Sequence, residues 1–142
     1  MTGWLLDTNV LSELRRAKPN TKVVAFVEAQ PLSALFVSEI TFAEIRFGIE
    51  LQTDAAKRSA IQEWLSNKLR PMFEHRMLPV SEDVIFRWRL LVDEGSKIGH
   101  TFPQPDLFLA ATALHHGLTL VSRNVNDYQK VANLALVNPW TA

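Results

Sequence analysis

Short, continuous apolar runs alternate along the chain with longer segments in which apolar and polar residues mix. Each apolar run ends at a polar or turn-forming residue, as a strand does when both faces of its sheet are covered. The predicted strands lie at residues 3–7, 35–37, 77–80, 119–122 and 135–138. This pattern predicts an α/β protein with a parallel sheet and helices packed on it.

The segments between these runs have the spacing of helices that bury one face. Residues 54–75 carry a stripe of apolar residues and are expected to be helical, ending near Pro71. In the helix expected at 81–95, the same spacing places Val84, Ile85 and Leu91 inward. Further helices are predicted at 8–16 and 105–116, after Pro19-Asn20 and after Ser38–Thr41, and a polar turn at 123–128.

The composition fits one globular domain over residues 1–142, with 47% apolar and 21% charged residues. The absence of cysteine excludes a disulfide scaffold, a thiolate nucleophile and a Cys-ligated zinc site. No signal-peptide pattern is present, and no apolar stretch approaches the ~18–20 residues that span a bilayer. We therefore expect a cytoplasmic protein that does not contact membranes.

The charges balance, with 15 Lys and Arg against 15 Asp and Glu, which argues against a basic coat that binds nucleic acid non-specifically. They are unevenly distributed, however. Residues 1–12 hold one charge, Asp7, and residues 98–142 hold four, Asp106, Arg123, Asp127 and Lys130. Carboxylates that stand alone in core-like sequence need a partner or a function.

Each of these acids follows the carboxyl end of a predicted strand or opens the next helix. Asp7 ends the first strand, and Glu44 lies near the start of the helix after the second. Asp106 opens the helix at 105–116, and Asn124 and Asp127 follow the fourth strand. In a parallel sheet the carboxyl ends of the strands share one edge, where ligands bind. We therefore expect these side chains to converge.

Each acid taken singly also has a structural explanation. Asp7 can cap a helix, Glu44 can complete a capping box with Thr41, and Asp106 can favour a helix dipole. Several carboxylates at one edge, however, would repel one another unless a cation lay between them. Oxygen ligands without Cys or a well-placed His suit Mg²⁺ or Mn²⁺. Such a metal can activate a water molecule and stabilise the charge of phosphodiester hydrolysis.

Four segments resemble the motifs of PIN-domain nucleases, in the same order. They are Leu5–Glu13, Thr41–Gly48, Asp106–Ala113, and Val121–Asn124 followed by Asp127-Tyr128. The ending Val137–Trp140 is similar to the FitB-like branch of the VapC toxins. The resemblance implies a three-layer α/β/α domain with a short, mainly parallel sheet. It also implies a Mg²⁺- or Mn²⁺-dependent endoribonuclease that acts as the toxin of a type II toxin–antitoxin pair, forms a homodimer and is blocked by its antitoxin.

Carried over by position, the resemblance makes Asp7, Glu44 and Asp106 the three core acids. Asp7 and Asp106 would be the main Mg²⁺ ligands, and Glu44 would complete the shell or orient the attacking water. The fourth position falls on Asn124 or Asp127, and Asp127 is favoured as the acid. Whether one or two metals bind is left open.

Neighbouring polar residues can support this site. Thr8, Asn9, Ser38, Ser122 and Asn124 can hold the carboxylates or metal-bound waters. Arg46 and Arg123, which lie close to site positions, can contact RNA or the antitoxin.

The four tryptophans carry a weaker signal. Trp4, Trp64 and Trp88 lie in a strand or on apolar stripes, which favours core packing over base stacking, and Trp140 is left open. Two alternatives remain for the function: a catalytically silent PIN-like interaction module and a structure-specific DNA nuclease.

Overall fold

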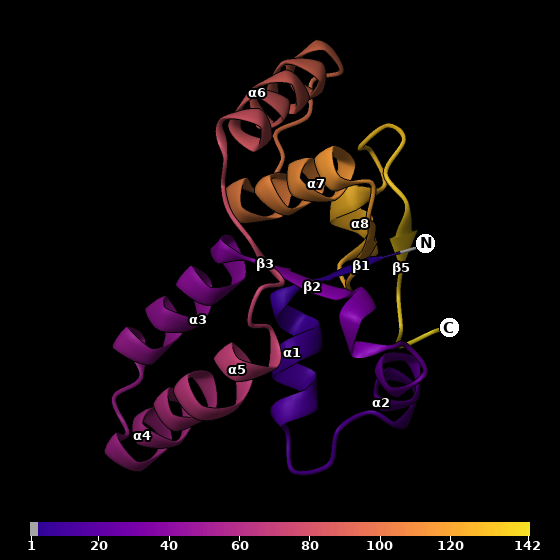
Figure 1. Cartoon of the computed structure of the whole chain (residues 1–142). Coiled ribbons are helices and arrows are strands. Elements are labelled where there is room, and N and C mark those ends of the chain that lie inside the picture. Colours follow the sequence, from indigo (N-terminus) through magenta and orange to yellow (C-terminus); the bar gives the residue numbers. More distant parts are fainter. Residues whose placement is uncertain (1–2) are drawn as a thin grey trace.

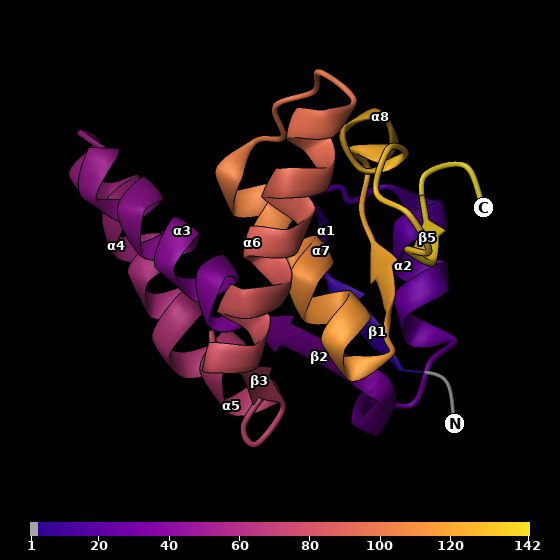
Figure 2. The same cartoon turned by 90° about the horizontal axis from the view of Figure 1, so that it is seen from above.

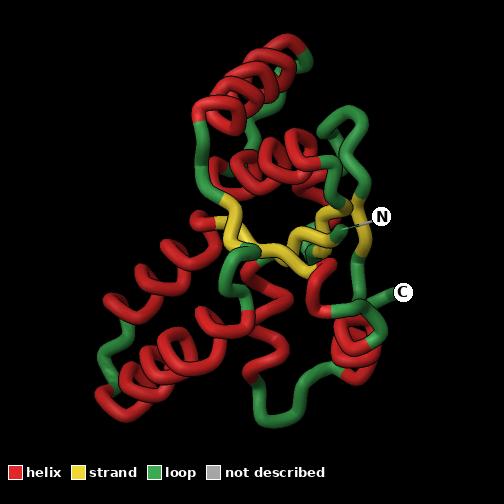
Figure 3. Tube along the Cα trace, viewed as in Figure 1, coloured by secondary structure: helices red, strands yellow, loops and turns green. Residues whose placement is uncertain are grey.

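Five parallel strands form the centre of the protein in a computed structural model that describes residues 3–142. The strand order is β3-β2-β1-β4-β5, and every pairing is parallel. Figure 3 shows the strands as a narrow band between helices. The strands are β1 (Trp4–Leu6), β2 (Leu35–Ser38), β3 (Met77–Leu78), β4 (Thr119–Val121) and β5 (Leu136–Val137).

Helices cover both faces of this sheet, which confirms the predicted α/β/α layering. In Figure 1, α6, α7 and α8 lie above the sheet, and α1, α2 and α5 lie below it. Figure 2 shows α3 and α4 projecting together to one side. The helices are α1 (Thr8–Arg15), α2 (Thr21–Glu28), α3 (Glu39–Leu51), α4 (Ala55–Trp64), α5 (Arg70–Met72), α6 (Glu82–Lys97), α7 (Gln104–His116) and α8 (Val125–Tyr128).

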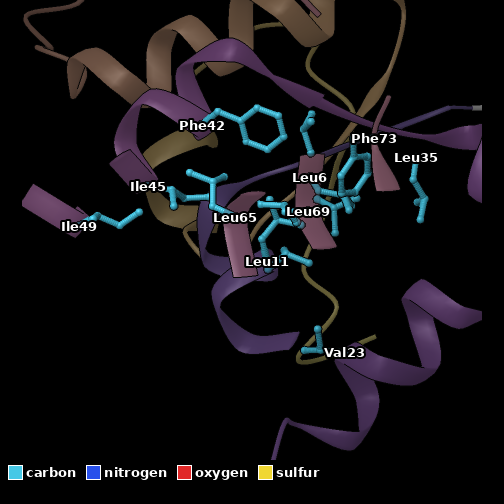
Figure 4. Close-up of a cluster of buried hydrophobic side chains, with 13 residues drawn as sticks. Leu6, Leu11, Val23, Leu35, Phe42, Ile45, Ile49, Leu65, Leu69 and Phe73 are labelled. Atoms are coloured by element: carbon cyan, nitrogen blue, oxygen red, sulfur yellow. The ribbon is translucent and has the colours of Figure 1, made fainter. Parts of the chain in front are cut away.

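The side-chain alternation of the strands divides the core into two clusters. Leu6 and Val121 contribute to the lower cluster, while their neighbours Leu5 and Leu120 contribute to the upper one. The lower cluster joins α3 to the rest of the domain, and in Figure 4 Phe42 and Ile45 lie near Leu65 and Leu69. Both faces of the short strands are therefore buried, which explains their continuous apolar sequence.

Helix termini fix where the functional side chains lie. Asp7 caps α1 by accepting a hydrogen bond from the backbone N–H of Thr8, and Ser38 caps α3 through the N–H of Ile40. Gly117 ends α7 in a left-handed conformation with φ of 65°, where glycine carries no Cβ penalty. Asp7 and Ser38 thus both stand where a strand turns into a helix, at one edge of the sheet.

Three local predictions differ from the structure. Residues 54–75 are not one regular helix, because a π-helical segment, Leu65–Leu69, separates α4 from α5. Ile85 was expected inward but is 43% exposed, since only part of the α6 stripe has a facing element. The turn predicted at 123–128 contains the short helix α8, which buries Tyr128.

No helix in the described part of the chain is long and apolar enough to cross a membrane.

Candidate active site

A cleft of about 660 Å³ opens at the carboxyl ends of β1 and β4, between α1, α3 and α7. Four carboxylates line it, Asp7, Glu13, Glu44 and Asp106. Basic side chains, Arg16 and Arg123, belong to the same wall. The cleft therefore presents both acidic and basic groups to whatever enters it.

Asp7 is held firmly at the floor of the cleft and is only 5% exposed. Its Oδ1 accepts the Thr8 N–H at 2.6 Å, and its Oδ2 accepts the hydroxyls of Ser122 at 2.8 Å and Tyr128 at 3.1 Å. Burial raises the pKa of Asp7, although these three hydrogen bonds oppose that shift. The carboxylate is thus fixed in one orientation while its negative charge remains poorly solvated.

Asp106 lies in the first turn of α7 and is half-buried. Burial, followed by the nearby charges of Asp7 and Asp127, raises its pKa to about 6. A cation placed near these carboxylates would relieve the repulsion that causes part of this shift. The electrostatics therefore favour a positively charged ligand at Asp106.

This shift predicts how the stability of the metal-free protein depends on pH. The folded-state pKa of Asp106 is above its unfolded value of 3.8, so the folded state binds more protons and stability increases as pH falls from 7 towards 4. After discounting for solvent screening at this half-buried site, the free energy of unfolding should gain about 1 kcal/mol. Urea unfolding in chelator at pH 7 and pH 5 measures this.

The matched variant is Asp106→Asn, which removes the titrating group. It should be more stable than the wild type at pH 7, and this advantage should shrink at pH 5. If Asp106→Asn were less stable than the wild type at pH 7, or if the stability difference did not change with pH, the raised pKa of Asp106 would not be the cause.

Asp127 and Glu44 differ from Asp7 and Asp106 in their position relative to the cleft and in their exposure to solvent. Asp127, in α8, is not part of the cleft wall, yet its charge lies close enough to raise the pKa of both Asp7 and Asp106. Glu44, on α3, lies in the cleft wall but is exposed to solvent. Among residues 3–142, no group of three or more His, Cys, Asp or Glu side chains is already arranged around a metal position.

Ser122 connects the end of β4 to the floor of the cleft. Its hydroxyl donates to Asp7, and its oxygen accepts the Asn9 side-chain amide at 3.2 Å and the Asn124 N–H at 3.0 Å. Asn9 in turn accepts the backbone N–H of Arg123 at 3.3 Å. These bonds tie the segment after β4 to α1 and orient Asp7.

The remaining predicted residues are placed differently from one another. Thr8 and Asn124 lie in the cleft wall, whereas Ser38 is buried and caps α3 outside it. Arg123 lies in the cleft, but Arg46 lies in two other hollows, beside Ala43 on α3. The structure therefore separates the two arginines that sequence proximity had grouped together.

Sequence reasoning gave no role to Tyr128 or Glu13, although both lie in the quoted motifs. Tyr128 is 1% exposed and donates to Asp7, and burial raises its pKa so that it stays a hydrogen-bond donor. Glu13 is buried and holds Arg16 at 3.2 Å and the Asn20 N–H at 2.9 Å. The one signal in the sequence for Tyr128 was its place in the fourth motif, directly after Asp127.

The fold and cleft define an α/β/α domain with a carboxylate-lined, arginine-rimmed site at the carboxyl edge of a parallel sheet. Residues 4–134 match the PIN domain, and the chain belongs to the PIN-domain family. This confirms the family resemblance read from the motifs.

Similarity to individual named proteins shows where the chain belongs within the PIN-domain family. The chain is 34% identical to VapC ribonuclease Y4jK of Sinorhizobium fredii, over 96% of each chain. It is 35% identical to Toxin FitB of Neisseria gonorrhoeae, over 96% of this chain and 97% of the relative. It therefore groups with the VapC and FitB proteins within the PIN-domain family.

Solved structures agree with this grouping. The crystal structure of FitAcB from Neisseria gonorrhoeae superimposes with a TM-score of 0.90 at 34% identity, covering 98% of this chain and 99% of the other. A toxin–antitoxin complex from Klebsiella pneumoniae gives a TM-score of 0.71 at 26% identity, covering 96% and 98%.

Proposed function

We propose that this chain is a Mg²⁺- or Mn²⁺-dependent endoribonuclease and the toxin of a type II toxin–antitoxin pair, with residues 1–142 acting as one PIN domain in the cytoplasm. The observation that carries the proposal is the carboxylate pair Asp7 and Asp106 in one arginine-rimmed cleft, with the pKa of Asp106 raised to about 6. The similarity to a VapC ribonuclease and to Toxin FitB supports the reaction class and the role.

The donor set fits a hard divalent cation. Mg²⁺ binds through one or two carboxylates and keeps several waters, so it does not need a complete cage of protein ligands. Asp7 and Asp106 would hold it, and the exposed Glu44 would complete the shell or orient a water. Such a metal would supply a water of lowered pKa and positive charge near the phosphate.

The protein's own groups supply positioning. The hydroxyls of Ser122 and Tyr128 fix the Asp7 carboxylate, so one ligand is held in place before substrate arrives. Asp127 keeps negative charge close to Asp106 without entering the cleft wall, which strengthens the attraction for a cation. Arg16 and Arg123 would contact RNA phosphates, because an acidic cleft alone would repel a polyanion.

The proposed partners are an antitoxin protein and a second copy of this chain. The similarity to a structure described as a toxin–antitoxin complex supports the first. Exposed apolar side chains, Phe47 and Leu51 on α3 and Phe86 on α6, support an interface that covers them. Contact with the antitoxin remains proposed for Arg46, which lies on α3 beside Phe47.

Incubating the purified protein, freed of antitoxin, with single-stranded RNA tests the proposal. Cleavage should occur with Mg²⁺ or Mn²⁺ and fall to background with EDTA, because the carboxylates alone provide no activated water. Gel analysis of end-labelled RNA measures this. A structured DNA substrate serves as the second arm. Absence of RNA cleavage with either metal favours the silent interaction module, and cleavage of DNA alone favours the DNA nuclease.

A further inference from the structure

Two tryptophans in the groove around the site each carry an arginine over their ring. The Arg15 guanidinium lies 5.8 Å from the centroid of Trp64, and that of Arg123 lies 5.2 Å from the centroid of Trp140. Trp140 and Arg123 belong to the acidic cleft itself. The proposed catalytic roles involve neither Trp64 nor Trp140.

The Trp64 pair lies in a hollow that continues from the cleft. This hollow has a volume of about 450 Å³ and lies between α1, α3 and α4. Thr8, Ser12 and Glu44 line both the hollow and the acidic cleft. The two volumes therefore form one groove, with Trp64 in one part and Trp140 in the other. Each part has a volume in the range of about 300–1,000 Å³ that is usual for ligand sites.

The groove holds four carboxylates, Asp7, Glu13, Glu44 and Asp106, so contact with a polyanion depends on its arginines. Among residues 3–142, neither Arg15 nor Arg123 forms an ion pair, and both side chains are exposed. Their charges are thus available to phosphates. Trp64 and Trp140 are half-buried and pack in part on the lower core cluster, so a base would have to stack on the part of each indole that faces the groove. Single-stranded nucleic acids are bound by this combination of cationic groups and stacking platforms.

Trp64 is also held rigidly. It is half-buried and packs against the lower core cluster, and the π-helical segment Leu65–Leu69 begins directly after it. Leu65 and Leu69 are both buried, so the segment is anchored in the core. Interrupted helices of this kind are frequent at functional sites, and a fixed ring loses little entropy when a base stacks on it.

From these observations we infer that the pairs Arg15–Trp64 and Arg123–Trp140 are two base-stacking subsites that bind single-stranded RNA on either side of the scissile phosphate. This inference rests on the proposed ribonuclease function and deepens it, since it assigns nucleotide subsites to particular residues. The enzyme would thereby select unpaired RNA, because bases within a duplex cannot reach the indole faces.

The chain contains a matched control pair. Arg89 lies 5.7 Å from the ring centroid of Trp88, and Trp88 stacks on Phe108 at 4.7 Å. Both residues lie on α6, the Trp88 ring packs on Phe108 of α7, and neither residue of the pair lines either section of the groove. It reproduces the geometry of a Trp–Arg pair without the proposed contact with RNA.

The test measures RNA affinity in the Asp106→Asn background, which prevents cleavage. Fluorescence anisotropy of a labelled single-stranded RNA of about 12 nucleotides, with Mg²⁺ present, reports binding. Trp64→Leu and Trp140→Leu keep apolar packing but remove the indole face, and each should weaken binding about tenfold. Arg15→Gln should lower the slope of log K against log salt by about 0.7. Trp88→Leu and Arg89→Gln should leave affinity and slope unchanged.

Circular dichroism of each variant separates binding from folding. RNA affinity that is unchanged in Trp64→Leu and Trp140→Leu, or reduced equally in Trp88→Leu, overturns the inference. The same holds if these variants keep their RNA affinity and lose only binding to a co-expressed antitoxin, because the groove would then bind protein. Failure of the proposed function is seen separately, as absent RNA cleavage by the wild type.

Discussion

Replacing Asp7 or Asp106 with asparagine is expected to lower metal-dependent RNA cleavage by more than about a hundredfold, since residues that only support metal ligands already cost about 10–100-fold. Each change removes a negative charge from the pair that would hold the cation, while the amide keeps the shape of the side chain. Initial rates of cleavage of an end-labelled RNA at saturating Mg²⁺ measure the loss. If both variants kept activity within tenfold of the wild type, the assignment of Asp7 and Asp106 to the active site would be wrong.

Both variants should fold, so the loss can be assigned to chemistry. Asp106→Asn relieves repulsion and should unfold at a higher urea concentration at pH 7. In Asp7→Asn, the amide oxygen can still accept the Ser122 and Tyr128 hydroxyls, and the variant loses only the hydrogen bond from the Thr8 N–H. Glu94→Gln, an exposed acid on α6 outside the cleft, is the matched control and should retain full activity.

Ser122→Ala is expected to destabilise the protein by about 2 kcal/mol, because it leaves hydrogen-bonding groups at the cleft floor without partners. The Ser122 hydroxyl is fully buried and serves Asp7, Asn9 and the Asn124 N–H at once. Asp7 would lose a donor that fixes its orientation. Cleavage should therefore fall about 10–100-fold, with a higher Mg²⁺ concentration needed for half-maximal rate.

Urea unfolding and a Mg²⁺ titration of the cleavage rate measure the two effects of Ser122→Ala separately. Thr112→Val is the control, since it removes another fully buried hydroxyl, which donates only to the Phe108 carbonyl within α7. That variant should keep the Mg²⁺ dependence of the wild type. An unchanged Mg²⁺ requirement in Ser122→Ala would show that the serine has a structural role alone.

The positions of the acids along the chain were sufficient to indicate where the site would lie. Asp7 directly follows an apolar run, and Asp106 opens a helix in a stretch with few charges. Both positions can be recognised from a short stretch of sequence, so recognising them does not require knowledge of the tertiary structure. Once the strands pair in parallel, Asp7 lies at their carboxyl edge, and the first turn of α7 brings Asp106 to the same cleft.

Side-chain directions were less predictable from local pattern. Periodicity marks Ile85 as apolar on the inner stripe of α6, but no element covers it and it is 43% exposed. Tyr128 reads as part of a polar turn, yet α8 buries it beneath Asp7. In both cases the outcome depends on which element packs opposite, and a sequence window does not contain that element.

The sequence by itself determined the alternation of elements, the parallel sheet, the family and which acids are candidates for the site, because hydrophobic period and motif order are properties of the linear chain. Only the tertiary structure decided that Asp127 stays outside the cleft wall, that Arg46 lies away from it, and that Trp64 and Trp140 share one groove. Those relations depend on the strand order β3-β2-β1-β4-β5 and on how the helices pack on one another, which joins residues far apart in the sequence.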